Sequence, residues 1–175
     1  MNLTFYGRPG IGKTSAARLI AKQFDWLSFS GTDKTIVSQV TNFASSVSFN
    51  GKHKVCIIDE ADGMPKSMQM ALGYKIDEFF NNCRFLLTTN DLSGLSEALQ
   101  SRCTPLCFNL SRDELKEVKE QSYGFYARRL EELELPFEGD KLRQIVEQHL
   151  PHHRAIAKQI ELEFGMPPEN QGEQS

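Results

Sequence analysis

Short apolar runs alternate with longer amphipathic segments through the first two thirds of the chain. The apolar runs predict strands over residues 2–6, 26–29, 54–58, 84–89 and 105–108. Helical spacing of apolar residues predicts helices over about 14–24, 33–47, 65–79 and 95–100. The run over 54–58 is continuously apolar, which is typical of a strand covered on both faces of a parallel sheet. The alternation of strands and helices therefore predicts an α/β fold with a doubly wound parallel sheet.

The pattern changes after residue 110. Ser111 is a suitable helix N-cap, and acidic Asp113 and Glu114 follow it in the first turn. Helical spacing then predicts three helices, over about 112–133, 140–150 and 151–164. We expect an α/β domain over residues 1–109, a small three-helix domain over 110–165 and a polar, disordered tail over 166–175. In the first domain, Asn50-Gly51 predicts a turn before the third strand.

Composition narrows the classes of function. The 175 residues carry a net charge of −3, so nucleic-acid binding would need a local basic patch. No apolar run reaches the roughly 18 residues of a membrane span, and the N-terminus lacks the pattern of a signal peptide. We therefore expect a cytoplasmic protein without a membrane partner. The four cysteines form no C-x-x-C pair, so we expect no zinc site, and we interpret Cys56 as a small core residue.

The segment from Gly7 to Thr14 matches the phosphate-binding loop G-x-x-x-x-G-K-[ST], between a predicted strand and a predicted helix. Glycines let the backbone approach a phosphate, and the helix N-terminus favours the anion. Lys13 would contact the terminal phosphates, and the Thr14 hydroxyl would be a Mg²⁺ ligand. The alternative is a glycine-rich turn with a surface lysine. The residues expected to bind nucleotide are Gly7, Pro9, Gly10, Ile11, Gly12, Lys13, Thr14 and Ser15.

Acidic residues follow the apolar strand over 54–58. Asp59 and Glu60 fit a Walker B motif, in which Asp59 would hold Mg²⁺ and Glu60 would orient and deprotonate a water. The alternative is two surface acids at a strand end. Asp62 completes the letters D-E-A-D, which we interpret as a coincidence because a DEAD-box helicase needs a second similar domain. Asn90 follows the next strand and is either a ligand of the γ-phosphate or attacking water, or an ordinary turn residue.

The sequence motifs alone leave the roles of two arginines open. Arg102 lies too far along the chain to contact its own nucleotide, so it is either a group that acts on a neighbouring subunit or a surface arginine. Arg154 is in the last predicted helix, where it either folds back on the phosphates or belongs to a solvated face.

Four motifs in this order resemble the AAA+ clamp-loader ATPases. They are G-x-P-G-x-G-K-T, C-I-I-D-E-A-D, L-L-T-T-N-D and L-Q-S-R-C, spread over a resemblance that covers about residues 2–165. The stretch from Thr41 to Gly51, together with Asn82-Cys83, is especially similar to the large clamp-loader subunits of T-even-type bacteriophages. The resemblance implies an AAA+ P-loop sheet sandwiched by helices, followed by a helical lid. Because the chain stops after the lid, we expect the family's C-terminal collar to be absent.

The resemblance also implies roles for the candidate residues. Gly7–Thr14 would be Walker A, Asp59 and Glu60 Walker B, and Asn90 sensor 1. Arg102 would be an arginine finger acting in trans, and Arg154 the sensor 2 arginine of the lid. The implied cofactors are ATP and Mg²⁺. The implied partners are other clamp-loader subunits, a sliding clamp and primer-template DNA, in the host cytoplasm if the protein is phage-encoded.

Three functions follow as hypotheses. The first is an ATPase subunit that loads the processivity clamp during DNA replication. The second is an ATP-binding scaffold subunit with little turnover, against which Lys13 and Glu60 argue because both residues serve hydrolysis. The third is a small P-loop kinase, for which the Ser-Arg-Cys motif has no use.

Overall fold

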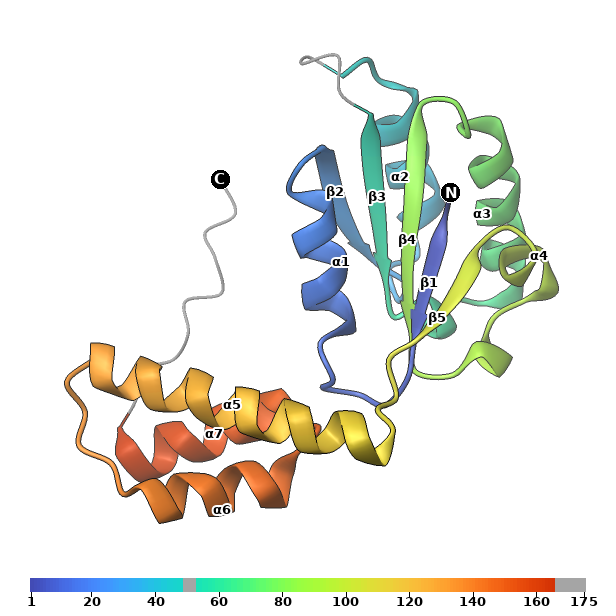
Figure 1. Cartoon of the computed structure of the whole chain (residues 1–175). Helices are drawn as coiled ribbons and strands as arrows, with labels where there is room; N and C mark the ends of the chain where they lie inside the picture. Colours follow the sequence, from blue (N-terminus) through green and yellow to red (C-terminus); the bar gives the residue numbers. More distant parts are fainter. Residues whose placement is uncertain (49–52, 166–175) are drawn as a thin grey trace. The chain divides into compact units, whose positions relative to one another are not determined.

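In a computed structural model of the chain, the described residues are 1–48 and 53–165. They belong to two compact units, Met1–Asn109 and Leu110–Ser175 (Figure 1). The turn predicted at Asn50-Gly51 and the tail predicted over 166–175 lie outside the described residues.

The first unit is built on a parallel sheet, which confirms the predicted fold class. Its strands are β1 (Leu3–Tyr6), β2 (Asp25–Ser30), β3 (Lys54–Asp59), β4 (Cys83–Thr89) and β5 (Thr104–Cys107). They lie in the order β2-β3-β4-β1-β5, and every pair is parallel. The helical segments are α1 (Lys13–Ala21), α2 (Ile36–Ser45), η1 (Ala61–Gly63), α3 (Lys66–Glu78), η2 (Leu92–Gly94) and α4 (Glu97–Gln100).

Both faces of the sheet are covered, which explains the continuous apolar run of β3. Val55 and Ile57 belong to a core cluster with α1, whereas Cys56 and Ile58 pack into the larger cluster with α2, α3 and α4. Figure 1 shows α1 on one side of the sheet and α2, α3 and α4 on the opposite side. Cys56 is fully buried, as predicted. Each β3 side chain is thus buried on one face of the sheet or the other, and this burial favours a position for β3 in the interior of the sheet.

Helix α1 is shorter than its periodicity predicts. Ala17 and Ala21 are fully buried, but Ile20 and Phe24 are 40% and 37% exposed. The helix ends at Ala21, whose carbonyl accepts a hydrogen bond from the Phe24 N–H, because β2 begins at residue 25 and the chain must turn before it. The predicted end at residue 24 was therefore wrong by one turn. Small alanines at the contact let α1 pack closely on the sheet.

Three helices begin at least two residues later than predicted, and α4 is one of them, since it begins at Glu97 instead of residue 95. Helix α2 begins at Ile36, not near residue 33, because the Asp33 carboxylate accepts hydrogen bonds from the Thr35 N–H and hydroxyl and fixes a turn there. The last helix begins at His153 and not at Pro151.

Strand β5 lies at an edge of the sheet and is exposed along its length. The N–H groups of Thr104 and Phe108 donate to the carbonyls of Asn2 and Tyr6, so residues at even positions face β1. Pro105 therefore occupies an outward position, where its missing N–H removes no bond to β1.

Between residues 110 and 165, the second unit contains three helices, α5 (Arg112–Glu132), α6 (Gly139–His149) and α7 (His153–Phe164). Ser111 caps α5 through a capping box with Glu114, as its sequence predicts. The fully buried side chains of the core are Leu130, Leu142, Val146, Ile156 and Ile160. Ion pairs join the helices in sequence: Lys119 with Glu147 and Arg143 with Glu120 connect α5 to α6, and Lys141 with Glu163 connects α6 to α7.

Lys54, the first residue of β3, is a charged side chain that is only 3% exposed. Its ammonium donates to the carbonyls of Phe43 at 2.8 Å and Ser46 at 2.6 Å, and so satisfies the C-terminal end of α2. It also lies 4.8 Å from the centre of the Phe43 ring. Lys54 thus ties α2 to the sheet.

Replacing Lys54 with methionine keeps the side-chain volume but leaves these helix-end carbonyls without their donor. We expect Lys54→Met to lower the free energy of unfolding by about 1–3 kcal/mol. Urea unfolding can be followed by fluorescence of Trp26, the single tryptophan, which pairs with Val55 in the sheet. Lys34→Met at an exposed position is the control, and an equal effect of the two changes would contradict this role of Lys54.

Candidate functional site

The loop between β1 and α1 approaches the end of β5 closely. Gly7 has φ +145°, and a Cβ there would lie 2.8 Å from Ile11 Cδ1 and 2.9 Å from Asn109 Oδ1. The same Asn109 oxygen accepts a hydrogen bond from the Arg8 N–H at 3.0 Å. Position 7 therefore requires glycine, and Asn109 anchors the start of the loop.

Helix α1 begins directly after this loop. Gly12 is its N-cap, with φ 94°, and no acidic residue lies in the first turn. The free N–H groups of the first turn and the positive end of the helix dipole are consequently available to an anion. Pro9, Gly10 and Ile11 lie in the loop, and Ser15 lies in the first turn of α1.

Lys13 connects the loop to β4. Its ammonium donates to the carbonyls of Gly7 at 2.7 Å and Arg8 at 2.9 Å, and to Asn90 Oδ1 at 3.0 Å. Burial lowers the pKa of Lys13 below its ordinary value, and the negative charges of Asp62 and Asp59 partly oppose this shift. The positive charge of Lys13 thus lies between the loop after β1 and the end of β4.

The Asp59 carboxylate is a second group, after Lys13, whose hydrogen bonds connect several elements. Its Oδ1 accepts a hydrogen bond from the Thr14 hydroxyl at 2.8 Å and another from the Thr88 hydroxyl. The Thr88 hydroxyl in turn accepts from the Glu60 N–H at 3.1 Å. Asp59, Thr14 and Thr88 come from β3, α1 and β4, so three elements meet at one carboxylate.

Glu60 and Asp62 form the turn that follows β3. Glu60 is in the left-handed region, with φ 55° and ψ 49°, and its side chain is exposed. Asp62 Oδ2 accepts a hydrogen bond from the Asn90 backbone N–H at 3.2 Å. The turn is therefore attached to Asn90, the residue that also contacts Lys13. The sequence motifs did not predict this structural role of Asp62, which was considered only as part of the letters D-E-A-D.

Gly31, just after β2, supports the same turn from the other side. Its N–H donates to the Asp59 carbonyl at 2.6 Å. A Cβ at this position would lie only 2.3 Å from the Glu60 carbonyl oxygen. The backbone of Glu60 can occupy its place only because residue 31 has no side chain.

The structure does not bring Arg102 to this site. Thr104 pairs with Leu3 at the start of β1, whereas the loop follows Tyr6 at the end of that strand, about 10 Å further along. Arg102 instead contacts Asp77 at the end of α3. Arg154 is exposed in the first turn of α7, in the second unit.

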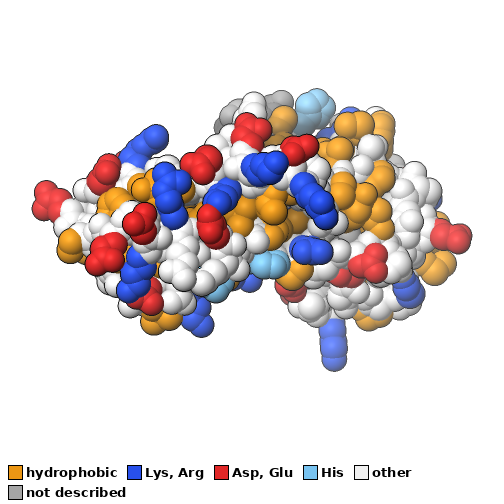
Figure 2. Space-filling model, turned by 60° about the horizontal axis from the view of Figure 1, so that its bottom comes forward, with side chains coloured by type: hydrophobic (Ala, Val, Ile, Leu, Met, Phe, Trp, Pro, Cys, Tyr) orange, Lys and Arg blue, Asp and Glu red, His pale blue; other side chains and the backbone are white. Residues whose placement is uncertain are grey.

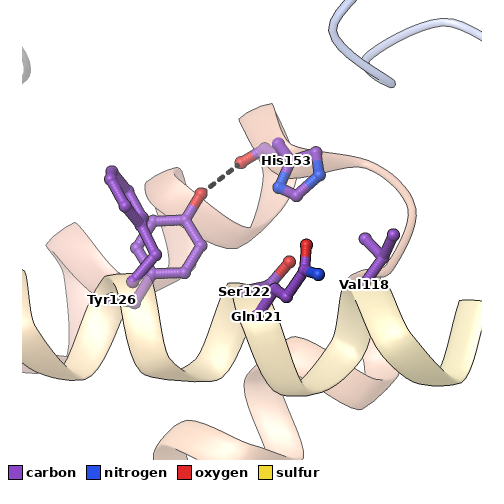
Figure 3. Close-up of a pocket in the computed structure, with 6 residues that line it drawn as sticks. Val118, Gln121, Ser122, Tyr126 and His153 are labelled. Carbon is purple, nitrogen blue, oxygen red and sulfur yellow. Dashed lines mark hydrogen bonds between the residues drawn. The ribbon is translucent and has the colours of Figure 1, made fainter.

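The second unit has a hollow of its own, of about 380 Å³, between α5 and the start of α7 (Figure 3). Its lining residues are Val118, Gln121, Ser122, Phe125, Tyr126 and His153. The Tyr126 hydroxyl donates to the His153 carbonyl at 3.2 Å, and burial lowers the pKa of the His153 ring. The bond fixes the beginning of α7 against α5.

On the face shown in Figure 2, basic and acidic side chains are interspersed. Within residues 1–48 and 53–165, no helix is long and apolar enough to cross a membrane.

Comparison with known proteins identifies the first unit. Residues 3–109 match the family described as "ATPase family associated with various cellular activities (AAA)". The chain belongs to the AAA ATPase family. Membership of this family implies that the chain binds a nucleotide.

Among curated proteins, the chain is 35% identical over 115 residues to the sliding-clamp-loader large subunit of Enterobacteria phage T4. That alignment covers 62% of this chain and 36% of the T4 protein. It is also 32% identical over 126 residues to the replication factor C small subunit of Methanosarcina barkeri, with 65% and 38% of the two chains covered. The aligned part thus spans less than half the length of these relatives.

Solved structures show the same AAA fold. A mutant of RuvB from Thermotoga maritima matches with a TM-score of 0.68 and 21% identity, over 90% of this chain and 53% of that chain.

Two residues that build this site, Asn109 and Gly31, lie outside the motifs, and a third, Thr88, lies within L-L-T-T-N-D but was given no role there. Thr88 and Asn109 supply the side chains that hold Asp59 and the loop, and Gly31 gives Glu60 its space. The sequence signal that could have identified these residues was their position at a predicted strand end, since all three lie at or just after the carboxyl end of β2, β4 or β5. Which of their atoms would meet depends on strand register, which the motifs do not contain.

A methyl group at residue 31 tests the support of the Glu60 turn. We expect Gly31→Ala to lower the free energy of unfolding of the AAA unit by about 1–3 kcal/mol and to reduce ATP turnover, although no functional side chain is removed. Gly124→Ala is the control, because no atom lies within 4 Å of a Cβ there and α5 should gain up to about 1 kcal/mol. Urea unfolding and steady-state ATPase measurements compare the two, and wild-type turnover in Gly31→Ala would contradict the close contact.

Proposed function

We propose that the chain is the AAA part of an ATP-hydrolysing subunit of a sliding-clamp loader. It would open the processivity clamp of a DNA polymerase and load it on primer-template DNA during DNA replication. The observation that carries the proposal is the convergence of Lys13, Asp59 and Asn90 at one edge of the sheet, in a chain similar to clamp-loader subunits over 62–65% of its length.

The divalent cation of ATP has suitable ligands in this cluster. The Thr14 hydroxyl and the Asp59 carboxylate are 2.8 Å apart, and hard oxygen atoms are the ligands that Mg²⁺ prefers. When bound, Mg²⁺ would neutralise charge on the β- and γ-phosphates. Lys13 would exchange its carbonyl acceptors for phosphate oxygens, and the N–H groups of the loop and of α1 would hold the rest of the triphosphate.

Hydrolysis needs a base and a group that orients the water. Glu60 would accept a proton from the attacking water as the oxygen bonds to the γ-phosphorus and ADP leaves. Asn90 would hydrogen-bond the γ-phosphate or that water through its amide NH₂, because its Oδ1 already accepts from Lys13. The Asp62 carboxylate would keep Asn90 in place through its backbone N–H.

Two arginines would complete the function from outside the cluster. Arg102 would act in trans on the ATP of a neighbouring subunit, and Arg154 would sense the γ-phosphate from a lid formed by residues 110–165. Partners would be further clamp-loader subunits, the clamp and primer-template DNA, in the cytoplasm of the host if the gene belongs to a phage. A scaffold subunit that binds ATP without turning it over is the alternative that the next experiment addresses.

Substitutions at two residues should affect ATP binding and ATP hydrolysis differently. Glu60→Gln removes the base but keeps the charge partner of the phosphates, so we expect near wild-type ATP affinity and a turnover about 10²–10⁴-fold lower. Lys13→Ala removes that charge, so affinity itself should fall about 10–100-fold. Fluorescent ATP binding and phosphate release measure both. If Glu60→Gln hydrolyses ATP like the wild type, its role as base is wrong, and if the wild type binds without hydrolysis, the scaffold is favoured.

A clamp loader should couple hydrolysis to its cargo. We expect primer-template DNA and the sliding clamp from the same source to stimulate steady-state ATPase several-fold when partner subunits are present. Single-stranded DNA without a primer is the control. Equal rates with and without clamp and primer-template would overturn the clamp-loader proposal while leaving the ATPase assignment intact.

A further inference from the structure

Arg102 lies away from the nucleotide cluster of its own chain, and its guanidinium is held in place by three acceptors. Its Nε and Nη2 donate to the same oxygen, Asp77 Oδ2, at 2.8 and 2.7 Å. Its Nη1 donates to the Ala98 carbonyl at 2.8 Å, with Ser101 Oγ at 3.4 Å. The Asp77 carboxylate raises the pKa of Arg102, so the group stays charged.

These contacts engage all three guanidinium nitrogens and use all but one of the N–H bonds. A guanidinium has five N–H bonds. Asp77 accepts from two of them, one on Nε and one on Nη2, and Ala98 and Ser101 accept from Nη1. The second Nη2 hydrogen has no acceptor among the described hydrogen bonds of Arg102, and the side chain is 28% exposed. An anion from another molecule can therefore be bound without breaking the contacts to Asp77 and Ala98.

Asp77 is well placed for this contact. It lies in the last turn of α3, which packs against α4, so the two elements that hold Arg102 are themselves in contact through Gly73 and Ala98. The Asp77 side chain is 56% exposed, and such a pair contributes little to folding. A long arginine side chain, however, loses considerable rotamer freedom when it reaches a fixed phosphate, and a partner that has already ordered it reduces that loss.

We propose that Asp77 is a positioning residue, which orders the Arg102 guanidinium so that its remaining Nη2 N–H meets a phosphate of ATP bound to a second copy of this chain. The inference rests on the proposed function, in which Arg102 acts in trans. Asp77 itself touches no phosphate. Its effect reaches the reaction only through Arg102.

The first measurement tests the contact in the full chain without any partner. In nitrogen-15 NMR spectra, the Arg102 Nε–H signal is assigned by its loss in Arg102→Ala. We expect Asp77→Ala to speed exchange of this hydrogen with water at least about fivefold, since its acceptor is gone. The control is Glu78→Ala, which removes the neighbouring carboxylate of α3, whose partner is Lys75 and not Arg102. Unchanged exchange in Asp77→Ala would overturn the proposal.

The second measurement is ATP hydrolysis as a function of chain concentration. A site completed by a second copy gives a specific activity that rises with concentration, and we expect Asp77→Ala to lower this activity about 3–10-fold while ATP affinity stays unchanged. Glu78→Ala should match the wild type, and Asp77→Glu should recover part of the loss. In an Arg102→Ala background, Asp77→Ala should have no further effect.

The outcomes separate failure of the inference from failure of the proposed function. If Arg102→Ala lowers the concentration-dependent activity and Asp77→Ala does not, Arg102 acts in trans and the role of Asp77 is wrong. If Asp77→Ala raises the activity, the carboxylate restrains Arg102 instead of positioning it, and the inference is also overturned. If specific activity is independent of concentration and Arg102→Ala equals the wild type, the trans role of Arg102 fails, and the inference fails with it.

Discussion

The Asp59 carboxylate is the interaction on which the arrangement of the site depends. It accepts hydrogen bonds from hydroxyl groups of α1 and β4 while it ends β3, so it joins the three elements that carry the candidate chemistry. The bonds are possible only because β3, β4 and β1 are parallel, in a register that brings their carboxyl ends to one edge. Burial of β3 on both faces in turn fixes this register, because a slip would exchange the two sets of core side chains.

A second network runs beside it. Lys13 contacts Asn90 through the side chain, and Asp62 contacts Asn90 through the backbone, so the loop after β1 and the turn after β3 both depend on the first residue after β4. These three segments therefore share one hydrogen-bond network.

The sequence was sufficient for the order of elements and for the residues of the motifs, since strand ends and glycine-lysine loops are local patterns. It was insufficient where contacts depend on register or on the course of the chain. Phe24 has the spacing of a core residue but lies past the end of α1, because β2 begins at the next residue. Gly31 and Asp77 lie near motif residues only in space, and no periodicity marks them. Asp62 was recognised in the sequence, but its contact with Asn90 could not be predicted without knowing that β3 and β4 are neighbouring strands.

The outward position of Pro105 has a consequence for how copies of this chain can associate. An edge strand usually invites another strand to extend the sheet, because its outward N–H and C=O groups are unpaired. In β5, the outward positions fall on Pro105 and Cys107, and the proline has no N–H to offer. The edge is therefore a poor template for intermolecular β-pairing. Association of copies at this edge is therefore left to side-chain contacts and not to extension of the sheet.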